Sequence, residues 1–314
     1  MRLRLFMLAA GLLIAAAAAQ ADTAPIAFGA DVGLAKFCKA VEQTLLDGDF
    51  DRLDATGRVA HDLTHRLPGG TTELELFYRG LAQSDCFDYD HCQKDDVFDR
   101  RRQQLEAWRD RAPADETPRV ALLRFWHIAA WAARGCGFAN TVTPAGWRLF
   151  GERLKIDAGY ARDLRPEDDP EATRILLELA RDFGAPGAQI EGIYKVGRTR
   201  FPTYFPLYDT FANMIEAKWS GRSDLATPYM RSLLIDPGGE TGDVAYSVAA
   251  STLIWATEGD QVFNPVTGID WPTAQRAFAT RARVYGLTPR DWMMLCYLAT
   301  AAGDRDAARA AFKA

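Results

Sequence analysis

Residues 204–215 read Tyr-Phe-Pro-Leu-Tyr-Asp-Thr-Phe-Ala-Asn-Met-Ile, and their apolar side chains repeat with the period of an α-helix. The stripe consists of Tyr204, Leu207, Tyr208, Phe211, Ala212 and Ile215. Spacings of three and four residues place such side chains on one face of a helix. The same period recurs in residues 271–285 and 292–299, and strand-like alternation is almost absent. The sequence therefore predicts an all-α protein.

Capping residues predict where several helices begin and end. Thr117-Pro118 and Thr288-Pro289 each place a hydroxyl before a proline, as at a helix N-terminus, and Asp291 completes the spacing of a capping box. Glycines that are expected to stop helices are Gly135, Gly286 and Gly303.

A short Gly-Asp turn recurs along the chain. Gly48-Asp49, Gly259-Asp260 and Gly303-Asp304 can each end one helix and cap the next. This arrangement predicts packed helix hairpins, either tetratricopeptide-like or in an irregular α-solenoid. The turn-forming stretch 165–170 is the best place for a division, which gives an N-terminal helical lobe at 22–164 and a C-terminal, repeat-like lobe at 165–314.

The N-terminus has the three-part layout of a secretory signal peptide. Arg2 and Arg4 precede the apolar stretch 6–19, and Ala19-Gln20-Ala21 offers small residues for cleavage. The apolar stretch is shorter than the roughly 20 residues that a membrane-spanning helix needs. We therefore expect residues 1–21 to be removed, and a periplasmic or secreted protein with no membrane insertion after cleavage.

Charge and composition exclude some partners. Without residues 1–21, 35 basic side chains face 42 acidic ones, and no lysine or arginine cluster stands out. Because nucleic-acid binding requires a basic face, we expect no nucleic-acid partner.

The five cysteines are Cys38, Cys86, Cys92, Cys136 and Cys296, so at least one must stay unpaired within the chain. Cys86 and Cys92 flank a short acidic loop, and their proximity predicts a disulfide. Zinc is the competing interpretation because His91 is close, but the spacing is not CxxC. We expect no metal and no cofactor.

The helix predicted over residues 118–134 is apolar almost all round, so it should be central. Its polar exceptions include Arg124, His127 and Arg134, which share a narrow fan with Trp131 at 100° per residue. This stripe could line a pocket for an anion or carboxylate. Alternatively, the arginines pair internally with acids such as Asp163, Glu167 or Glu178. We expect Arg134 to be held by a carboxylate or by helix-end carbonyls.

Two other groups are weaker candidates. Trp219 and Arg222, in Trp-Ser-Gly-Arg, can present an aromatic ring and a guanidinium to a ligand, or simply end a helix. His61 and His65 stand one helical turn apart, but Asp replaces the Glu of a metalloprotease motif and a third ligand is missing, which favours a polar helix face.

No catalytic motif stands out, and the catalytic residues stay unknown. There is neither a GxSxG elbow nor a phosphate-binding glycine loop. The sequence favours a protein-interaction or scaffold module in the cell envelope, whose partner is another protein or a peptide. The alternative is an envelope enzyme or small-ligand binder that uses a cleft near Arg134, and whether the chain is an enzyme stays open.

Several stretches together resemble a bacterial family classed as a domain of unknown function with tetratricopeptide-like helices. They are residues 66–70 (RLPGG), 76–80 (LFYRG), 130–139 (AWAARGCGFA), 219–221 (WSG) and 302–304 (AGD). The family often has Trp-Gly-Gly in place of Trp219-Ser220-Gly221, and its C-terminal helix usually runs further. The resemblance spans nearly all of residues 22–314 and implies a fold, but no catalytic residue.

Overall fold

The computed structural model describes residues 23–83, 97–135, 137–220, 222–257 and 261–314. These residues are built from helices, without a strand, which confirms the all-α prediction. A single isolated bridge between Arg66 and Thr72 is the only β-type pairing among them. The predicted signal peptide, the Cys86–Cys92 pair, His91 and the Gly259-Asp260 turn lie outside the described residues.

The helices follow one another through short connections. The α-helices are α1 Leu34–Asp47, α2 Phe50–Ala60, α3 Glu73–Ala82, α4 Phe98–Arg111, α5 Thr117–Arg134, α6 Pro144–Ala161, α7 Pro170–Asp182, α8 Gly187–Arg200, α9 Pro206–Ile215, α10 Ala217–Ser220, α11 Ala226–Leu233, α12 Gly239–Leu253, α13 Trp271–Tyr285, α14 Pro289–Ala301 and α15 Arg305–Lys313. Between them lie three short 3-10 helices, η1 Pro68–Gly70, η2 Ala139–Thr141 and η4 Ile254–Ala256, and one π-helical turn, η3 Leu234–Gly238.

Most of the predicted helix ends are confirmed. Thr288 and Asp291 form the reciprocal capping box of α14. Gly48 ends α1 in the left-handed conformation, and Asp49 accepts a hydrogen bond from the Arg52 amide to begin α2. Asp304 caps α15 in the same way after Gly303, so both described Gly-Asp turns join a helix hairpin.

The predicted cap at Thr117 is wrong. Helix α5 already includes Thr117, Glu116 is its N-cap residue, and no side chain caps it directly. The Asp115 carboxylate instead accepts the Thr117 amide at 2.9 Å, two residues before the threonine that the pattern assigned as the cap. An acid before the first turn satisfies the same free donors as a hydroxyl would.

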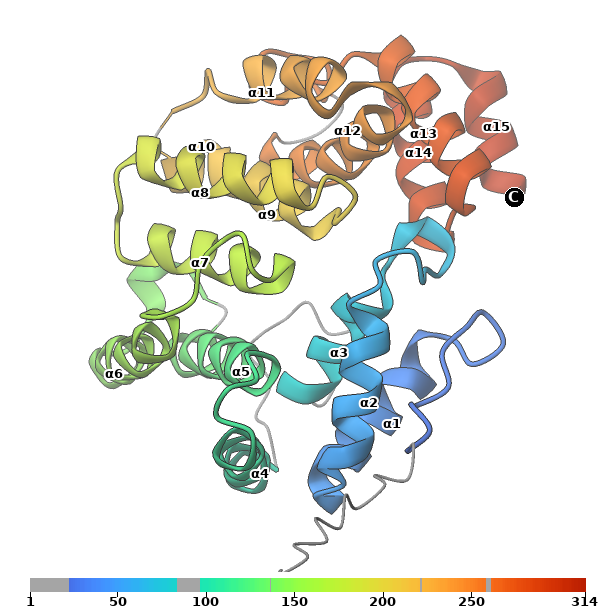
Figure 1. Ribbon diagram of the computed structural model, residues 1–314. Coiled ribbons are helices and arrows are strands. Elements are labelled where there is room, and N and C mark those ends of the chain that lie inside the picture. Colours follow the sequence, from blue (N-terminus) through green and yellow to red (C-terminus); the bar gives the residue numbers. More distant parts are fainter. Residues whose placement is uncertain (1–22, 84–96, 136, 221, 258–260) are drawn as a thin grey trace, which may run out of the picture.

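Neighbouring helices pack in pairs, chiefly α5 with α6, α7 with α8, α12 with α13 and α14 with α15. Figure 1 shows the chain passing from α1–α3 to α4–α6, then through α7–α10 to the C-terminal helices α11–α15. The arrangement is compatible with an all-α repeat or solenoid. No helix in the described residues has the length and apolarity needed to cross a membrane.

The loop after α2 reaches the C-terminal helices (Figure 1). Gly69 donates its amide to the Gly286 carbonyl, and its own carbonyl accepts two hydrogen bonds from Arg281. Arg66 lies between the rings of Phe205 and Tyr285, 5.2 Å from each centroid. We call residues 66–70, with these contacts, the clasp. It connects segments more than 200 residues apart in sequence.

One buried hydrophobic cluster extends from Ile26 to Leu298. It therefore includes residues from both sides of the predicted division at 165–170, and α5 also packs against α7 across that point. The division into two lobes stays a prediction about sequence organisation, while the core that surrounds the site is shared.

Candidate functional site

Helix α5 lies centrally, as its apolar composition predicts, and it packs against α3, α4, α6 and α7. Arg124 and His127 are buried, whereas Trp131 and Arg134 are half-buried towards the C-terminal end. Arg124, His127 and Trp131 each contact an acid on α7, so the predicted stripe does face a single neighbour. The structure thereby brings the stripe together with an acidic face that the sequence analysis did not identify.

Glu171 is the innermost of these acids and is fully buried. It pairs with Arg124, with Arg174 at 2.7 Å, and accepts a hydrogen bond from the Tyr204 hydroxyl at 2.6 Å. Arg124 is thus paired with an internal acid, as the alternative interpretation expected, but Glu171 is not one of the acids that it named, Asp163, Glu167 and Glu178. Burying the charged guanidinium of Arg124 without a partner would cost free energy of folding, and the charge-assisted hydrogen bond to Glu171 offsets that cost.

His127 lies one turn further along α5, among three carboxylates. Its Nδ1 is 3.2 Å from Asp157 on α6, and its Nε2 is 3.4 Å from Glu178 and 3.8 Å from Asp182 on α7. Because both ring nitrogens face acceptors, the imidazolium form fits this environment best. Burial opposes the charge, but the three carboxylates raise the pKa of His127 above its ordinary value.

Asp157 is fully buried opposite His127. Burial, with added repulsion from Glu178 and Asp182, raises the pKa of Asp157 to about 6, although His127 partly opposes the shift. One of its oxygens, Oδ1, has no hydrogen-bond partner. An isolated buried carboxylate oxygen of this kind favours protonation.

The outer end of the stripe continues as alternating aromatic rings and cations. The guanidinium of Arg134 lies 5.1 Å from the Trp131 ring centroid and 5.2 Å from that of Trp147. Arg181 lies 5.1 Å from Trp131 and 5.0 Å from Trp219. We call Trp147, Arg134, Trp131, Arg181 and Trp219 the aromatic–arginine ladder. Each spacing is within the range of a cation–π contact.

Four helices supply the ladder: α5, α6, α7 and α10. Its two outer tryptophans, Trp147 and Trp219, are each 41% exposed, unlike the tryptophans in the core. Trp131 and Trp219 meet edge to face with their centroids 6.0 Å apart. The ladder therefore presents a rigid aromatic surface at the protein exterior.

Arg134 is held as the sequence predicts. Its Nη1 donates to the carbonyls of Gly135 at 3.0 Å and Gly137 at 3.1 Å, just past the end of α5. Arg153 on α6 similarly donates to the Ala129 carbonyl and stacks on Phe98. Among the residues that the structure describes, no carboxylate forms an ion pair with the guanidinium of Arg134 or of Arg153. Within the described part of the chain, Arg134 of the ladder thus donates to neutral carbonyls and not to a carboxylate.

Of the other two predicted binding residues, only Trp219 joins the ladder. Arg222 is exposed and forms a bidentate pair with Asp224, two residues away. Two ladder members, Arg181 and Trp147, were not predicted as binding residues from the sequence. Their signal was weak, because Trp147, Arg181 and Trp219 lie on three different helices that only tertiary packing brings together.

The histidine pair is divided between two acids. His61 Nε2 lies 2.9 Å from Asp169 and its Nδ1 2.6 Å from the Gly57 carbonyl, whereas His65 Nδ1 lies 3.0 Å from Glu73. Within the described part of the chain, no group of three His, Cys, Asp or Glu residues could hold a metal ion. His61 and His65 thus form part of the polar segment at the C-terminal end of α2.

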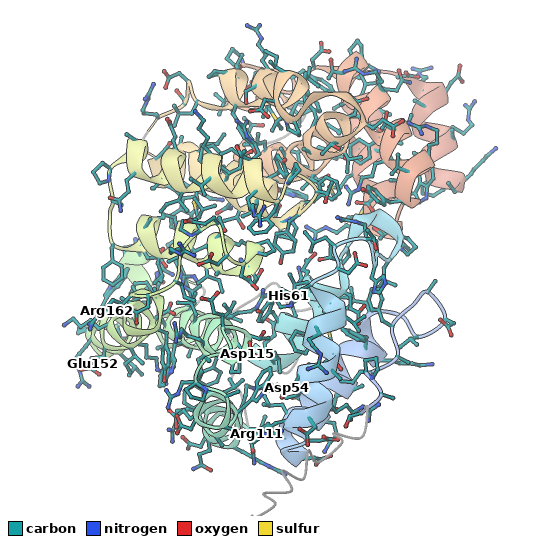
Figure 2. The ribbon with its side chains drawn as sticks, in the orientation of Figure 1. Asp54, His61, Arg111, Asp115, Glu152 and Arg162 are labelled. Atoms are coloured by element: carbon teal, nitrogen blue, oxygen red, sulfur yellow. The ribbon has the colours of Figure 1, made fainter. Side chains whose placement is uncertain are left out.

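In Figure 2, His61, Asp115, Asp54 and Arg111 follow one another from top to bottom, between α2 and the helices α4 and α5. Asp54 accepts the indole N–H of Trp108 at 2.7 Å. Arg111 pairs with an aspartate of α2, and the Asp115 carboxylate accepts the Thr117 amide at the start of α5. The contacts of Asp54 and Arg111 join α2 to α4.

Two cysteines are assigned. Cys38 is disulfide-bonded, and Cys296 is a free thiol. A bond from Cys38 was not predicted from sequence, because its nearest cysteine is 48 residues away.

Comparison with known proteins gives no further assignment: no protein-family model matches the chain, and neither curated proteins nor solved structures give a significant match.

Proposed function

We propose that this chain is a protein-interaction module of the cell envelope, and that the aromatic–arginine ladder binds an acidic segment of a partner protein. The observation that carries the proposal is the pair of outer tryptophans, each 41% exposed and stacked on arginines. Tryptophan and arginine are the residues that most often dominate binding energy at protein interfaces.

The partner's charge follows from the guanidinium of Arg134 within the ladder. Arg134 donates to two backbone carbonyls, and none of the carboxylates that the structure describes forms an ion pair with it. A carboxylate of a bound peptide can pair with such a guanidinium more strongly than a neutral acceptor does. An acidic segment with an apolar side chain therefore complements the surface better than a basic one.

The alternative is an envelope enzyme or small-ligand binder that acts near Arg134. The acids and the histidine behind the ladder would be its natural catalytic groups. His127, Asp157 and Glu171 are buried and largely engaged with one another or with arginines, however. Such internal pairing supports a structural role for them and favours the interaction function.

The envelope location rests on the sequence of residues 1–21. Cell fractionation with N-terminal sequencing of the purified protein tests it, and we expect a periplasmic or secreted protein that begins at Asp22. Intact Met1 in a membrane fraction would contradict the location without affecting the ladder.

The binding test uses the full-length mature protein and an array of overlapping acidic and basic peptides from envelope proteins. Hits are measured in solution by fluorescence anisotropy against Trp147→Ala and Trp219→Ala variants. We expect each variant to weaken binding about tenfold or more, which corresponds to ~1.4 kcal/mol. Trp255→Ala is the matched control, since Trp255 is 61% exposed and stacks on Tyr297, far from the ladder in sequence.

Any of three results would overturn the proposal. The first is that no acidic peptide binds, and the second is that basic peptides bind equally well. The third is that Trp255→Ala weakens binding as much as the ladder variants do, since binding would then not depend on this surface.

A further inference from the structure

We propose that Asp182 is the positioning residue of the ladder, and that protonated His127 behind it makes ligand binding pH-dependent. The inference rests on the proposed function for its ligand, an acidic peptide segment. Its structural part concerns only this chain and can be tested without the ligand.

Asp182 is the last residue of α7, and its side chain is 3% exposed. Its Oδ1 accepts a hydrogen bond from the Arg181 Nε at 2.8 Å, and its Oδ2 accepts one from the Trp131 indole N–H, also at 2.8 Å. Arg181 is the cation between the Trp131 and Trp219 rings. One carboxylate therefore fixes the central ring of the ladder and the guanidinium beside it.

The same Oδ2 is 3.8 Å from the Nε2 of His127, which connects the ladder to the buried acids. The groups that face His127 are Asp157 from α6 and Glu178 and Asp182 from α7. The neighbouring cations are already bound, because Arg174 pairs with Glu178 and Arg181 with Asp182. The positive charge of His127 therefore offsets the negative charges of Asp157 and of the Oδ2 oxygen of Asp182.

Loss of the His127 proton changes what the ring can offer. A neutral imidazole donates from one nitrogen only, so the other presents a lone pair to a carboxylate. If Nδ1 keeps its proton for Asp157, Nε2 repels Asp182 and Glu178. Asp182 then moves away from the ring, and its hydrogen bonds to Trp131 and Arg181 weaken. Binding should therefore decrease as the pH rises.

The structural part is tested on the full-length mature protein by NMR. The indole Nε1–H resonance of Trp131, assigned with Trp131→Phe, is followed from about pH 5 to about pH 8.5, where histidine titrates. We expect it to shift with the same midpoint as the His127 ring. His127→Gln should abolish this transition, and Asp182→Asn should displace the resonance at every pH while Asp182→Glu partly restores it.

Glu152→Gln, on the exposed side of α6, is the matched control and should leave the resonance unchanged. Circular dichroism reports whether each variant is folded. If His127→Gln does not fold, the pH titration of the wild type and of Asp182→Asn decides the question. A Trp131 resonance that does not move with pH in the wild type overturns the inference.

The binding part uses the tightest acidic peptide from the array. We expect its affinity to fall about tenfold or more between the two ends of the pH range, and Asp182→Asn to lose most of the pH dependence. If binding does not depend on pH, the inferred role of His127 in regulating binding is wrong. Absence of any peptide binding, with a Trp131 resonance that still titrates, refutes the proposed function but supports the positioning role of Asp182.

Discussion

The guanidinium of Arg124 shows how a single residue determines its neighbours. Arginine keeps its charge even when buried, so α5 can place Arg124 in the core only if another helix supplies acceptors. Glu171 does so, and it also binds Arg174 and Tyr204. The sequence indicated that a buried arginine would be paired, but not which acid would pair with it, because that depends on how α5 and α7 pack.

Glu171→Gln should be among the most destabilising single changes in the chain. It leaves the buried Arg124 without its counter-charge, and removing one member of a buried pair typically costs about 3–5 kcal/mol. Chemical denaturation of both proteins measures the difference. Glu152→Gln removes an acid whose side chain is 53% exposed and 3.6 Å from Arg148, and its effect should stay below about 0.5 kcal/mol. Equal effects would show that Glu171 does not hold the helices together.

Arg134→Ala separates stability from binding at the ladder. Arg134 is half-buried, donates to two helix-end carbonyls and stacks on two indoles. Contacts of this kind at a partly exposed helix end contribute about 1 kcal/mol. We therefore expect a small decrease in melting temperature and a large loss of acidic-peptide binding. Unchanged binding with a much lower melting temperature would make Arg134 a brace only.

At the level of elements, the clasp connects the loop after α2 to α13 and α14. Gly69 has a φ of +81° and lies against Asp291, Thr288 and Arg281. A Cβ there would be 2.9 Å from an Asp291 oxygen and 3.0 Å from a Thr288 methyl carbon, both in well-held residues. Only glycine fits the conformation and the space together.

Gly69→Ala should therefore destabilise more than Gly303→Ala. Gly303 also has a positive φ, of 73°, but nothing lies within 4 Å of its would-be Cβ. Both variants incur the backbone penalty of roughly 1–2 kcal/mol for a left-handed residue. Only Gly69→Ala adds a clash at the Arg281–Asp291 pair, so we expect about 2 kcal/mol more destabilisation by urea denaturation. Equal losses would mean that the clasp adjusts freely.

Helix ends were more predictable than helix neighbours. The Gly48-Asp49 turn, the Gly303-Asp304 turn and the Thr288 capping box are formed as the sequence indicates, because capping is decided within a few residues. The clasp and the ladder could not be predicted in this way. Each joins residues on separate helices, and Arg281 is 212 residues from Gly69.

At the scale of the whole molecule, burial affects its acids more than ion pairing does. The carboxyls whose pKa is raised, in each case mainly by burial, are Asp54, Glu73, Glu116, Asp157, Asp209 and Glu216. The pKa of His61 is raised as well, by Asp169 and against the effect of burial. Lowered values occur at exposed acids such as Asp62, whose carboxylate accepts from Thr64. The folded protein thus holds protons that the unfolded chain releases.

The free energy of unfolding should therefore decrease as the pH rises from about 4 to about 7.5. For Asp157, the folded pKa of about 6 exceeds the ordinary value of 3.8, so folding takes up a proton between these values and stability falls across that window. For His61 and His127 the raised pKa gives stability that is present below about pH 6.5 and is lost as the pH passes the folded value. Both contributions have the same sign. Each such proton contributes a slope of up to about 1.4 kcal/mol per pH unit.

Denaturation at a series of pH values measures this slope, and Asp157→Asn should flatten it between about pH 4 and about pH 6, while Asp62→Asn should not. A stability that rises over this range would show that the buried acids are ionised in the folded protein and paired more strongly than their positions beside His127 and in the core imply.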